Sequence, residues 1–267
     1  HTLANETTAA FERTRDRVAN WINATRREEI VFTRGTTEAI NLVAQAYLRP
    51  KLQPGDEIVV SRMEHHANIV PWQMLRDATG AELQVIPINE RGELLLDELE
   101  GMLSERVKLL GIVHVSNALG TVNPVAEVCR MAKKYDIPVL VDGAQALPHL
   151  RVDVQELGCD MLSLSGHKFH APKGIGALYV RKGTPFVSFL HGGHQEKGRR
   201  GGTENVAAIV GLGKACQLAK QMMEEENTRV RALRDKLEQG LLAAVPKSMR
   251  NGHAEQRLPN RITLPLA

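Results

Sequence analysis

The residues best suited to chemistry follow two apolar runs. Val139–Val141 leads into Asp142, and a later apolar run ends in Ser165, His167 and Lys168. Parallel strands deliver polar side chains at their carboxyl ends, so we expect both groups at one edge of a sheet. Because lysine is rarely buried without a partner, Lys168 is better suited to a covalent role than to packing.

A lysine near a carboxylate is the pair that pyridoxal 5'-phosphate (PLP) enzymes require. In such enzymes the amine holds the cofactor as a Schiff base, and the carboxylate keeps the pyridine nitrogen protonated so that the ring withdraws electrons. We therefore interpret Lys168 and Asp142 as candidates for these two roles.

The residues of these motifs and their order along the chain resemble those of a known family. The segments 142–145 (Asp-Gly-Ala-Gln) and 165–168 (Ser-Gly-His-Lys) are similar to those of the fold type I, class V aminotransferase superfamily, and within it to the cysteine desulfurases and related selenocysteine lyases. The resemblance implies a PLP enzyme that converts L-cysteine to L-alanine and leaves an enzyme-bound persulfide. The sulfur would serve iron-sulfur cluster biogenesis or another transfer pathway, through an acceptor or scaffold protein.

A glycine turn near the start of the chain is a candidate phosphate site. The β-branched run 30–33 is followed by Gly35, Thr36 and Thr37, which open a helical pattern. The free N–H groups and dipole of a helix N-terminus favour phosphate, but plain N-capping by Thr36 explains the pattern equally well. The resemblance assigns Thr36 and Thr37 to the PLP phosphate.

Two adjacent histidines follow the expected strand 57–61. His65 and His66 point in different directions on an extended chain, and no further ligand lies nearby at metal spacing, so we expect no metal here. The segment 64–72 resembles group II desulfurases. That resemblance places the ring of His65 on the pyridine, where it is suited to proton transfer, and leaves His66 with a structural role.

The resemblance assigns four further cofactor contacts. Asn117 follows the expected strand 109–115, where an Asn commonly bonds its own turn. The family pattern instead places Asn117 and Gln145 beside the PLP ring, and Ser165 and His167 at its phosphate.

The segment 191–205 is rich in glycine and charge. By composition alone it is a flexible loop, and His191 with His194 is only a weak metal signal. In the family, the matching segment crosses a homodimer and offers a Thr hydroxyl to the phosphate bound by the other subunit. The resemblance therefore assigns Thr203 to the partner's PLP and implies that a homodimer is needed for activity.

Alternating strand and helix patterns predict an α/β fold. We expect helices over 3–24, 95–104, 125–136 and 206–240, and a mainly parallel, seven-stranded-type sheet with helices on both faces. Residues 1–221 would form a PLP-binding large domain, and residues 222–267 the beginning of a smaller α/β domain whose first strand covers 261–266.

Composition excludes several classes of partner. With 34 basic and 31 acidic residues the net charge is +3, which suggests no nucleic-acid footprint. No apolar run reaches the roughly 20 residues of a membrane span, and residues 1–6 do not resemble a signal peptide. Three widely spaced cysteines favour a reducing cytoplasm without disulfides.

Two features depart from the family pattern. The chain resembles group II desulfurases up to about residue 154 and group I desulfurases over 163–213, which leaves the sulfur pathway open. The family's nucleophilic cysteine lies well over 100 residues after the lysine, whereas 99 residues follow Lys168 here. Cys129, Cys159 and Cys216 match no nucleophile loop, and Cys216 fits a packed helix. We therefore expect a fragment that also lacks the family's opening segment before His1.

Three alternatives stay open at this point. Another class V lyase or aminotransferase would share every residue named above. An inactive dimerisation or scaffold fragment would fit the expected truncation. A nucleotide-binding protein could use the turn at 34–37, but the sequence contains neither G-x-x-x-x-G-K-[ST] nor the glycine fingerprint of a dinucleotide fold.

Overall fold

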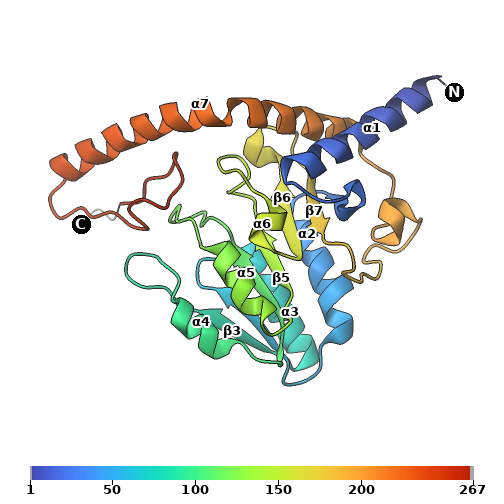
Figure 1. Cartoon of the computed structure of the whole chain (residues 1–267), viewed down its shortest axis with the longest axis horizontal. Helices are drawn as coiled ribbons and strands as arrows, with labels where there is room; N and C mark the ends of the chain where they lie inside the picture. Colours follow the sequence, from blue (N-terminus) through green and yellow to red (C-terminus); the bar gives the residue numbers. More distant parts are fainter. Residues whose placement is uncertain (1, 265–267) are drawn as a thin grey trace.

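A computed structural model describes residues 2–264, in which one mixed sheet is covered by helices (Figure 1). The strands are β1 (Ile30–Thr33), β2 (Glu57–Ser61), β3 (Glu82–Ile86), β4 (Val107–Val113), β5 (Val139–Asp142), β6 (Met161–Ser165) and β7 (Gly176–Val180). The helices are α1 (Thr2–Trp21), α2 (Thr36–Leu42), α3 (Val70–Thr79), α4 (Leu96–Met102), α5 (Val125–Lys133), α6 (Val154–Leu157) and α7 (Val206–Ala244).

The sheet has the expected mainly parallel topology. Its seven strands lie in the order β1-β7-β6-β5-β4-β2-β3. Strand β7 runs antiparallel to both of its neighbours, and every other pair is parallel. Because β7 reverses direction between β1 and β6, these two strands and β2 to β5 all end at the same edge. The predicted α/β class and sheet are therefore confirmed.

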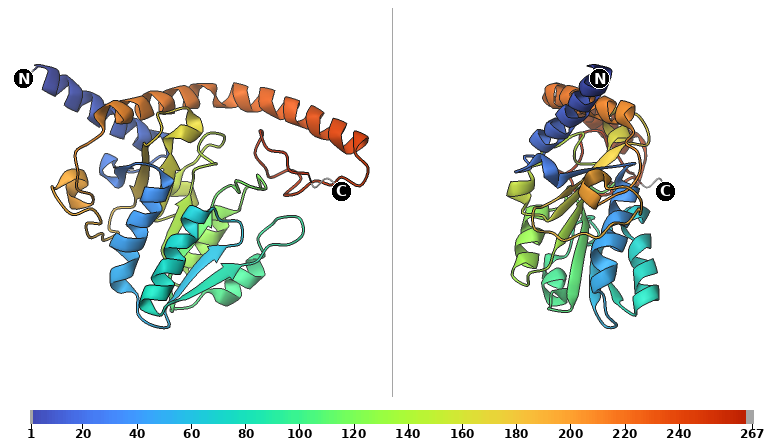
Figure 2. Two further views of the ribbon diagram at one scale, coloured as in Figure 1. Left: turned by 180° about the vertical axis from the view of Figure 1, so that it is seen from behind. Right: turned by 90° about the vertical axis from the view of Figure 1, so that its right-hand side faces the viewer.

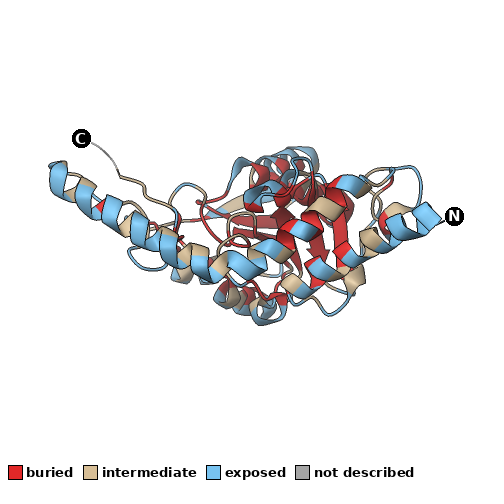
Figure 3. Cartoon of the chain, turned by 90° about the horizontal axis from the view of Figure 1, so that it is seen from above, coloured by how far each residue is buried: buried red, intermediate tan, exposed pale blue. Residues whose placement is uncertain are grey.

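Period-two alternation divides the core between the two faces of the sheet. Val139 and Val141 belong to one apolar cluster, with residues of α1, α4, α5 and α7, whereas Leu140 belongs to the second cluster with residues of α2 and α3. Successive strand residues point to opposite faces, so a strand covered on both sides is apolar throughout. Figures 2 and 3 show the sheet enclosed between these helix layers, with the buried residues concentrated in it.

The end of the chain differs from the expected pattern. Helix α7 is continuous for 39 residues, so the division that we expected after residue 221 lies inside it. Residues 261–264 form no strand, and the rest of the strand expected over 261–266 lies outside the described residues. These residues instead return toward the loop after β4 (Figure 1). Over residues 2–264, none of the helices combines the length and apolar character of a membrane span.

Candidate active site

A cavity of about 650 Å³ lies at the carboxyl-terminal edge of the sheet. Its wall includes nine of the ten residues predicted from the sequence: Thr36, Thr37, His65, Asn117, Asp142, Gln145, Ser165, His167 and Lys168. The tenth, Thr203, is exposed and is not among the residues that line this cavity. The structure therefore brings together residues that lie up to 132 positions apart in the sequence, and their individual roles stay a prediction.

Asp142 closes β5 at the floor of the site. Its carboxylate accepts the backbone N–H of Ala144 at 2.9 Å, and the Ser163 hydroxyl lies 3.5 Å away. The side chain is buried, and this burial raises the pKa of Asp142, while the hydrogen bond from Ala144 and the positive charge of Lys168 act in the opposite direction. A buried carboxyl held in this way is suited to pairing with a cationic ring nitrogen.

Lys168 lies in a 3₁₀ turn, Gly166–Phe169, that directly follows β6. A Cβ on Gly166 would sit 2.9 Å from Ala171, the Ile175 carbonyl and Leu212, so only glycine fits at the start of this tight turn. The side chain of Lys168 is exposed on the cavity wall. The turn therefore carries the amine out of the strand and into the open cavity.

Ser165 and His167 form a pair on the same wall. The Ser165 hydroxyl lies 2.9 Å from His167 Nδ1. Partial desolvation of the His167 ring and the nearby charges of Lys168 and Lys173 lower the pKa of this imidazole. At neutral pH the pair therefore offers hydrogen bonds without adding a full positive charge.

The turn after β1 carries an unpartnered hydroxyl. Helix α2 begins at Thr36, and its N-cap is Gly35, which makes no side-chain capping bond. Thr36 Oγ1 is buried and has no hydrogen-bond partner in the described structure. The N-capping alternative for Thr36 is therefore wrong. A buried donor of this kind is costly unless a ligand satisfies it, and it lies on the cavity wall with the helix N-terminus.

His65 ends the turn between β2 and α3. Its Nδ1 accepts the backbone N–H of Ala67 at 3.1 Å, as the cap of a short 3₁₀ turn. The ring of His66 stands nearly perpendicular to it, at 82° and 6.0 Å between centroids, and does not line the cavity. Among residues 2–264 there is no group of three or more His, Cys, Asp or Glu side chains placed to hold a metal.

Sequence reasoning missed a buried carboxyl beside His65. Glu64 accepts hydrogen bonds from the Ser61 hydroxyl, from the Val113 N–H at 2.8 Å and from the Asn68 amide at 2.6 Å. Asn68 can approach β4 because Gly111 has no side chain; a Cβ there would lie 3.1 Å from its amide oxygen. The only signal in the sequence was a glutamate between a buried strand and two histidines, which does not distinguish it from a surface residue.

None of the three cysteines is suited to nucleophilic attack. Cys129, Cys159 and Cys216 are free and buried. Burial raises the pKa of Cys129 and of Cys216 to about 12, and it also raises the pKa of Cys159. The reactive form of cysteine is the thiolate, so these residues act as packed apolar side chains.

The donor set of the cavity fits PLP. Lys168 supplies an accessible amine, Asp142 a buried carboxyl, and Thr36 a hydroxyl without a partner beside a helix N-terminus. These are the groups that a carbonyl, a pyridine nitrogen and a phosphate require, and they line one cavity of sufficient volume.

Comparisons with known proteins agree with this site. The model of the family "Aminotransferase class-V" matches residues 1–267. A cysteine desulfurase from Dickeya dadantii is 56% identical over 179 residues, which are 67% of this chain and 43% of the relative. A protein named cysteine desulfurase IscS, from Dictyoglomus turgidum, is 39% identical over 267 residues, which are 100% of this chain and 67% of the relative.

Solved structures give the same assignment. The apo structure of a cysteine desulfurase from Thermococcus onnurineus superimposes with a TM-score of 0.92 at 31% identity, over 100% of this chain and 70% of that one. The chain spans 35% to 60% of the length of three of the curated relatives that it matches. It therefore belongs to the class-V aminotransferase family, in the group of the cysteine desulfurases.

Proposed function

We propose that the whole protein is a PLP-dependent cysteine desulfurase that removes sulfur from L-cysteine. The observation that carries the proposal is the cavity at the sheet edge, where an accessible Lys168 amine, the buried Asp142 carboxyl and the unpartnered Thr36 hydroxyl meet. When bound, PLP withdraws electrons from the Cα of an amino-acid substrate. Membership of the cysteine desulfurase group supports L-cysteine as that substrate, and selenocysteine is the closest chemical alternative.

Three residues of the cavity carry out the chemistry in this proposal. Lys168 Nζ would attach the cofactor and would move protons at the substrate. Asp142 holds the proton of the pyridine nitrogen. His65 covers the ring and exchanges a proton through Nε2, because its Nδ1 is occupied by the N–H of Ala67.

The remaining polar side chains orient the cofactor. Thr36, Thr37, Ser165 and His167 bind the phosphate in this proposal, and Asn117 and Gln145 contact the ring. All six side chains line the same cavity, which supports the assignment, since a rigid ring needs several contacts to be held in one orientation.

The sulfur acceptor comes from elsewhere in the proposed reaction. The C–S bond of L-cysteine breaks as a cysteine thiolate takes the sulfur, which gives L-alanine and a persulfide. The three cysteines of this chain are buried as thiols, so we assign the acceptor to a residue outside 1–267. A sulfur-accepting protein partner, iron-sulfur cluster biogenesis and a cytoplasmic location belong to the same proposal.

The partner subunit supplies the tenth predicted residue. Thr203 is exposed beside the loop that Glu196 anchors, through a buried ion pair with Arg15 at 2.8 Å. An exposed hydroxyl on an anchored loop supports a contact with the phosphate site of a second copy. We therefore propose a homodimer in which each Thr203 serves the partner's cavity.

The visible absorption spectrum with added PLP tests the cofactor site. We expect the wild type and Lys173→Ala to show a band at wavelengths above those of free PLP, and Lys168→Ala to lack it. L-cysteine should change the band without release of sulfide, because the three cysteines of this chain are buried as thiols. A folded wild type without a Lys168-dependent band would rule out the proposal for this chain and would favour an inactive scaffold.

A further inference from the structure

The outer half of α7 buries one residue, and it is a glutamate. The inner half packs Ala208, Ile209, Leu212, Gly213, Ala215 and Cys216 into the molecule, but beyond Cys216 only Glu238 is buried in this helix. Figure 3 shows the outer half as mainly exposed. Apolar packing therefore does not explain how this part of the helix is joined to the rest of the protein.

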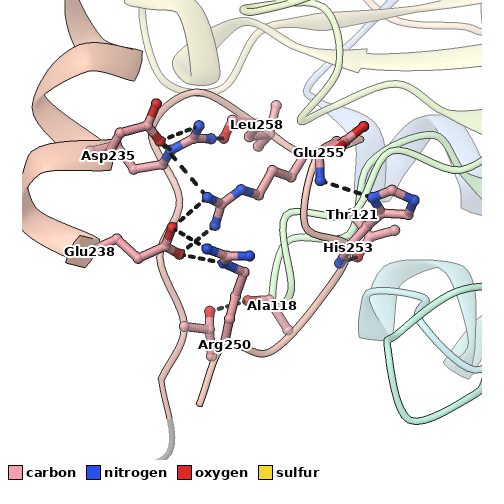
Figure 4. Close-up of polar contacts among 11 residues, drawn as sticks. Ala118, Thr121, Asp235, Glu238, Arg250, His253, Glu255 and Leu258 are labelled. Carbon is pink, nitrogen blue, oxygen red and sulfur yellow. Dashed lines mark hydrogen bonds and ion pairs between the residues drawn. The ribbon is translucent and has the colours of Figure 1, made fainter. Parts of the chain in front are cut away.

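Glu238 instead clamps the segment that follows α7 (Figure 4). Its two oxygens accept hydrogen bonds from Arg250 at 2.9 and 3.0 Å and from Arg257 at 2.6 Å each. The side chains of Glu238 and Arg257 are 3% and 6% exposed. Hydrogen bonds from Arg257 and then from Arg250 lower the pKa of Glu238 to about 2, so the clamp is fully charged at neutral pH.

Arg234 adds a second link from the helix to the same segment. Its guanidinium donates to the Leu258 carbonyl at 2.7 Å and to Asp235 at 2.7 Å. Leu258 is fully buried and belongs to the main apolar cluster. The segment between Arg250 and Leu258 is therefore held by its ion pairs with Glu238 and by the packing of Leu258 in the core.

The clamped segment is bonded along its length to the loop after β4, as Figure 4 shows in part. Three bonds lie within the segment: the N–H of Val122 donates to Gln256 O at 2.9 Å, the N–H of Leu258 to Gly120 O at 2.9 Å, and the N–H of His253 to Thr121 Oγ1 at 3.2 Å. Just beyond the segment, the Thr263 hydroxyl donates to Ala118 O at 2.9 Å. Gly120 has φ of 76°, and a Cβ there would lie 2.8 Å from Arg261.

The same loop carries Asn117 to the cavity. It is closed by bonds from the N–H of Ser116 to Thr121 O at 3.0 Å and from the N–H of Gly120 to Ser116 O at 2.9 Å. Asn117 lies between these bonds and lines the cavity. The backbone that sets its direction is thus bonded to the segment that Glu238 holds.

We infer that Glu238 is a positioning residue for Asn117, and that it acts through Arg257 and the segment 250–258. Glu238 does not line the cavity. It holds the returning segment against the loop 116–122 and so holds Asn117 at the ring edge. The inference rests on the proposed binding of PLP, since the role of Asn117 belongs to that proposal.

The first arm of the test measures the loop without cofactor. Hydrogen–deuterium exchange of the apo protein compares Glu238→Gln with Glu226→Gln, a control on the same helix that removes an exposed carboxylate paired with Arg229 at 2.7 Å. We expect exchange in residues 116–122 to rise about fivefold or more in Glu238→Gln, with the inner half of α7 unchanged. Unchanged exchange in the loop would overturn the inference, whether or not PLP binds.

The second arm separates positioning from general stability. We expect Glu238→Gln to raise the dissociation constant of PLP about three- to tenfold, and by less than about twofold when Asn117→Ala is already present. An equal rise in both backgrounds would mean that Glu238 acts on the fold and not through Asn117. If Glu238→Gln does not fold, Arg250→Gln removes one arm of the clamp, and the same outcomes apply.

The two arms distinguish this inference from the proposed function. A wild type that fails to bind PLP defeats the proposed function, while faster loop exchange in Glu238→Gln would still show that Glu238 holds the loop of Asn117. If the wild type binds PLP and folded Glu238→Gln binds it with the same affinity, only the positioning role is defeated.

Discussion

His65 accepts a hydrogen bond at Nδ1 from the backbone N–H of Ala67, across 3.1 Å. A ring nitrogen that accepts a hydrogen bond carries no proton, so the neutral imidazole has its proton on Nε2. Because the ring lines the cavity, Nε2 is the atom that can exchange a proton with a bound substrate.

Replacing His65 by alanine should slow proton transfer without removing the cofactor. We expect a loss of about 10²- to 10⁴-fold in the exchange of the substrate Cα–H with solvent deuterium, followed by NMR with PLP and L-alanine. The Lys168-dependent absorption band should persist. His66→Ala is the matched control, since His66 does not line the cavity, and an equal loss in both variants would contradict the assignment.

Thr36→Val should change stability and affinity in opposite directions. The buried hydroxyl of Thr36 has no partner in the described structure, so its removal should stabilise the apo protein by up to about 1 kcal/mol. Loss of a bond to phosphate should raise the dissociation constant of PLP about tenfold.

Chemical denaturation and PLP titration measure the two effects of Thr36→Val. Thr79→Val is a useful comparison, because that hydroxyl already donates to the Leu75 carbonyl at 2.7 Å. A destabilised Thr36→Val with normal PLP affinity would show that the hydroxyl serves the fold.

Glu64 should make stability fall as pH rises. Burial raises the pKa of Glu64 to about 8, above about 4.3 in an unfolded chain. Between these values the folded protein keeps a proton that the unfolded chain releases, so raising the pH favours unfolding. Urea unfolding from pH 5 to pH 8 should show a shallower decline for Glu64→Gln than for wild type. Parallel curves for the two proteins would refute this, and Glu6→Gln controls for surface charge.

Glu238 should show the opposite pH dependence. Its pKa is lowered to about 2 by Arg257 and Arg250, so the folded protein binds fewer protons than the unfolded chain as the pH falls below about 4.5. The stability difference between wild type and Glu238→Gln should be fully present at pH 6 and shrink between about pH 4.5 and pH 2. Thermal unfolding across this range measures it, and a difference that does not change with pH would exclude a charged clamp.

Mixed dimers test the role of Thr203. Lys168→Ala and Thr203→Val, each in a different subunit, leave one intact composite site in the mixed dimer, whereas both changes in one subunit leave none when it is paired with wild type. We therefore expect the first mixture alone to regain absorption and exchange above the values of its parents. Equal behaviour of the two mixtures would place Thr203 outside both sites, and recovery in the second mixture alone would place it in its own subunit's site.

Residue periodicity was sufficient to predict the sheet and the edge where the site lies. Runs such as Val139–Val141 are apolar because helices cover both faces of the sheet. The carboxyl ends of parallel strands lie at one edge of that sheet, so the polar residues that follow them lie close together. Lys168 was placed correctly on that edge, but the exposure of its amine could not be predicted, since a turn of four residues decides where the amine points.

Other features depended on contacts that no local pattern records. Glu238 lies in a charged helical stretch that is typical of a solvated face, and only the returning chain, with Arg250 and Arg257, buries it. Glu64 is buried for a similar reason, because β4 supplies the Val113 N–H from 49 residues away. The strand expected at 261–266 is not formed in residues 261–264, where the chain bonds to Ala118 instead.

The pairing of β1 with β7 also governs when the site can form during synthesis. Ile30 of β1 lies opposite Tyr179 of β7, so 149 more residues must be synthesised after Ile30 before its partner in the sheet is available. At about 5–20 residues per second that wait is roughly 7–30 s. During this interval Ile30–Thr33 is an unpaired apolar edge, and we expect chaperones that hold nascent chains to bind there. The turn with Thr36 follows this strand directly, so we expect it to reach its final geometry only after Gly176–Tyr179 has been added.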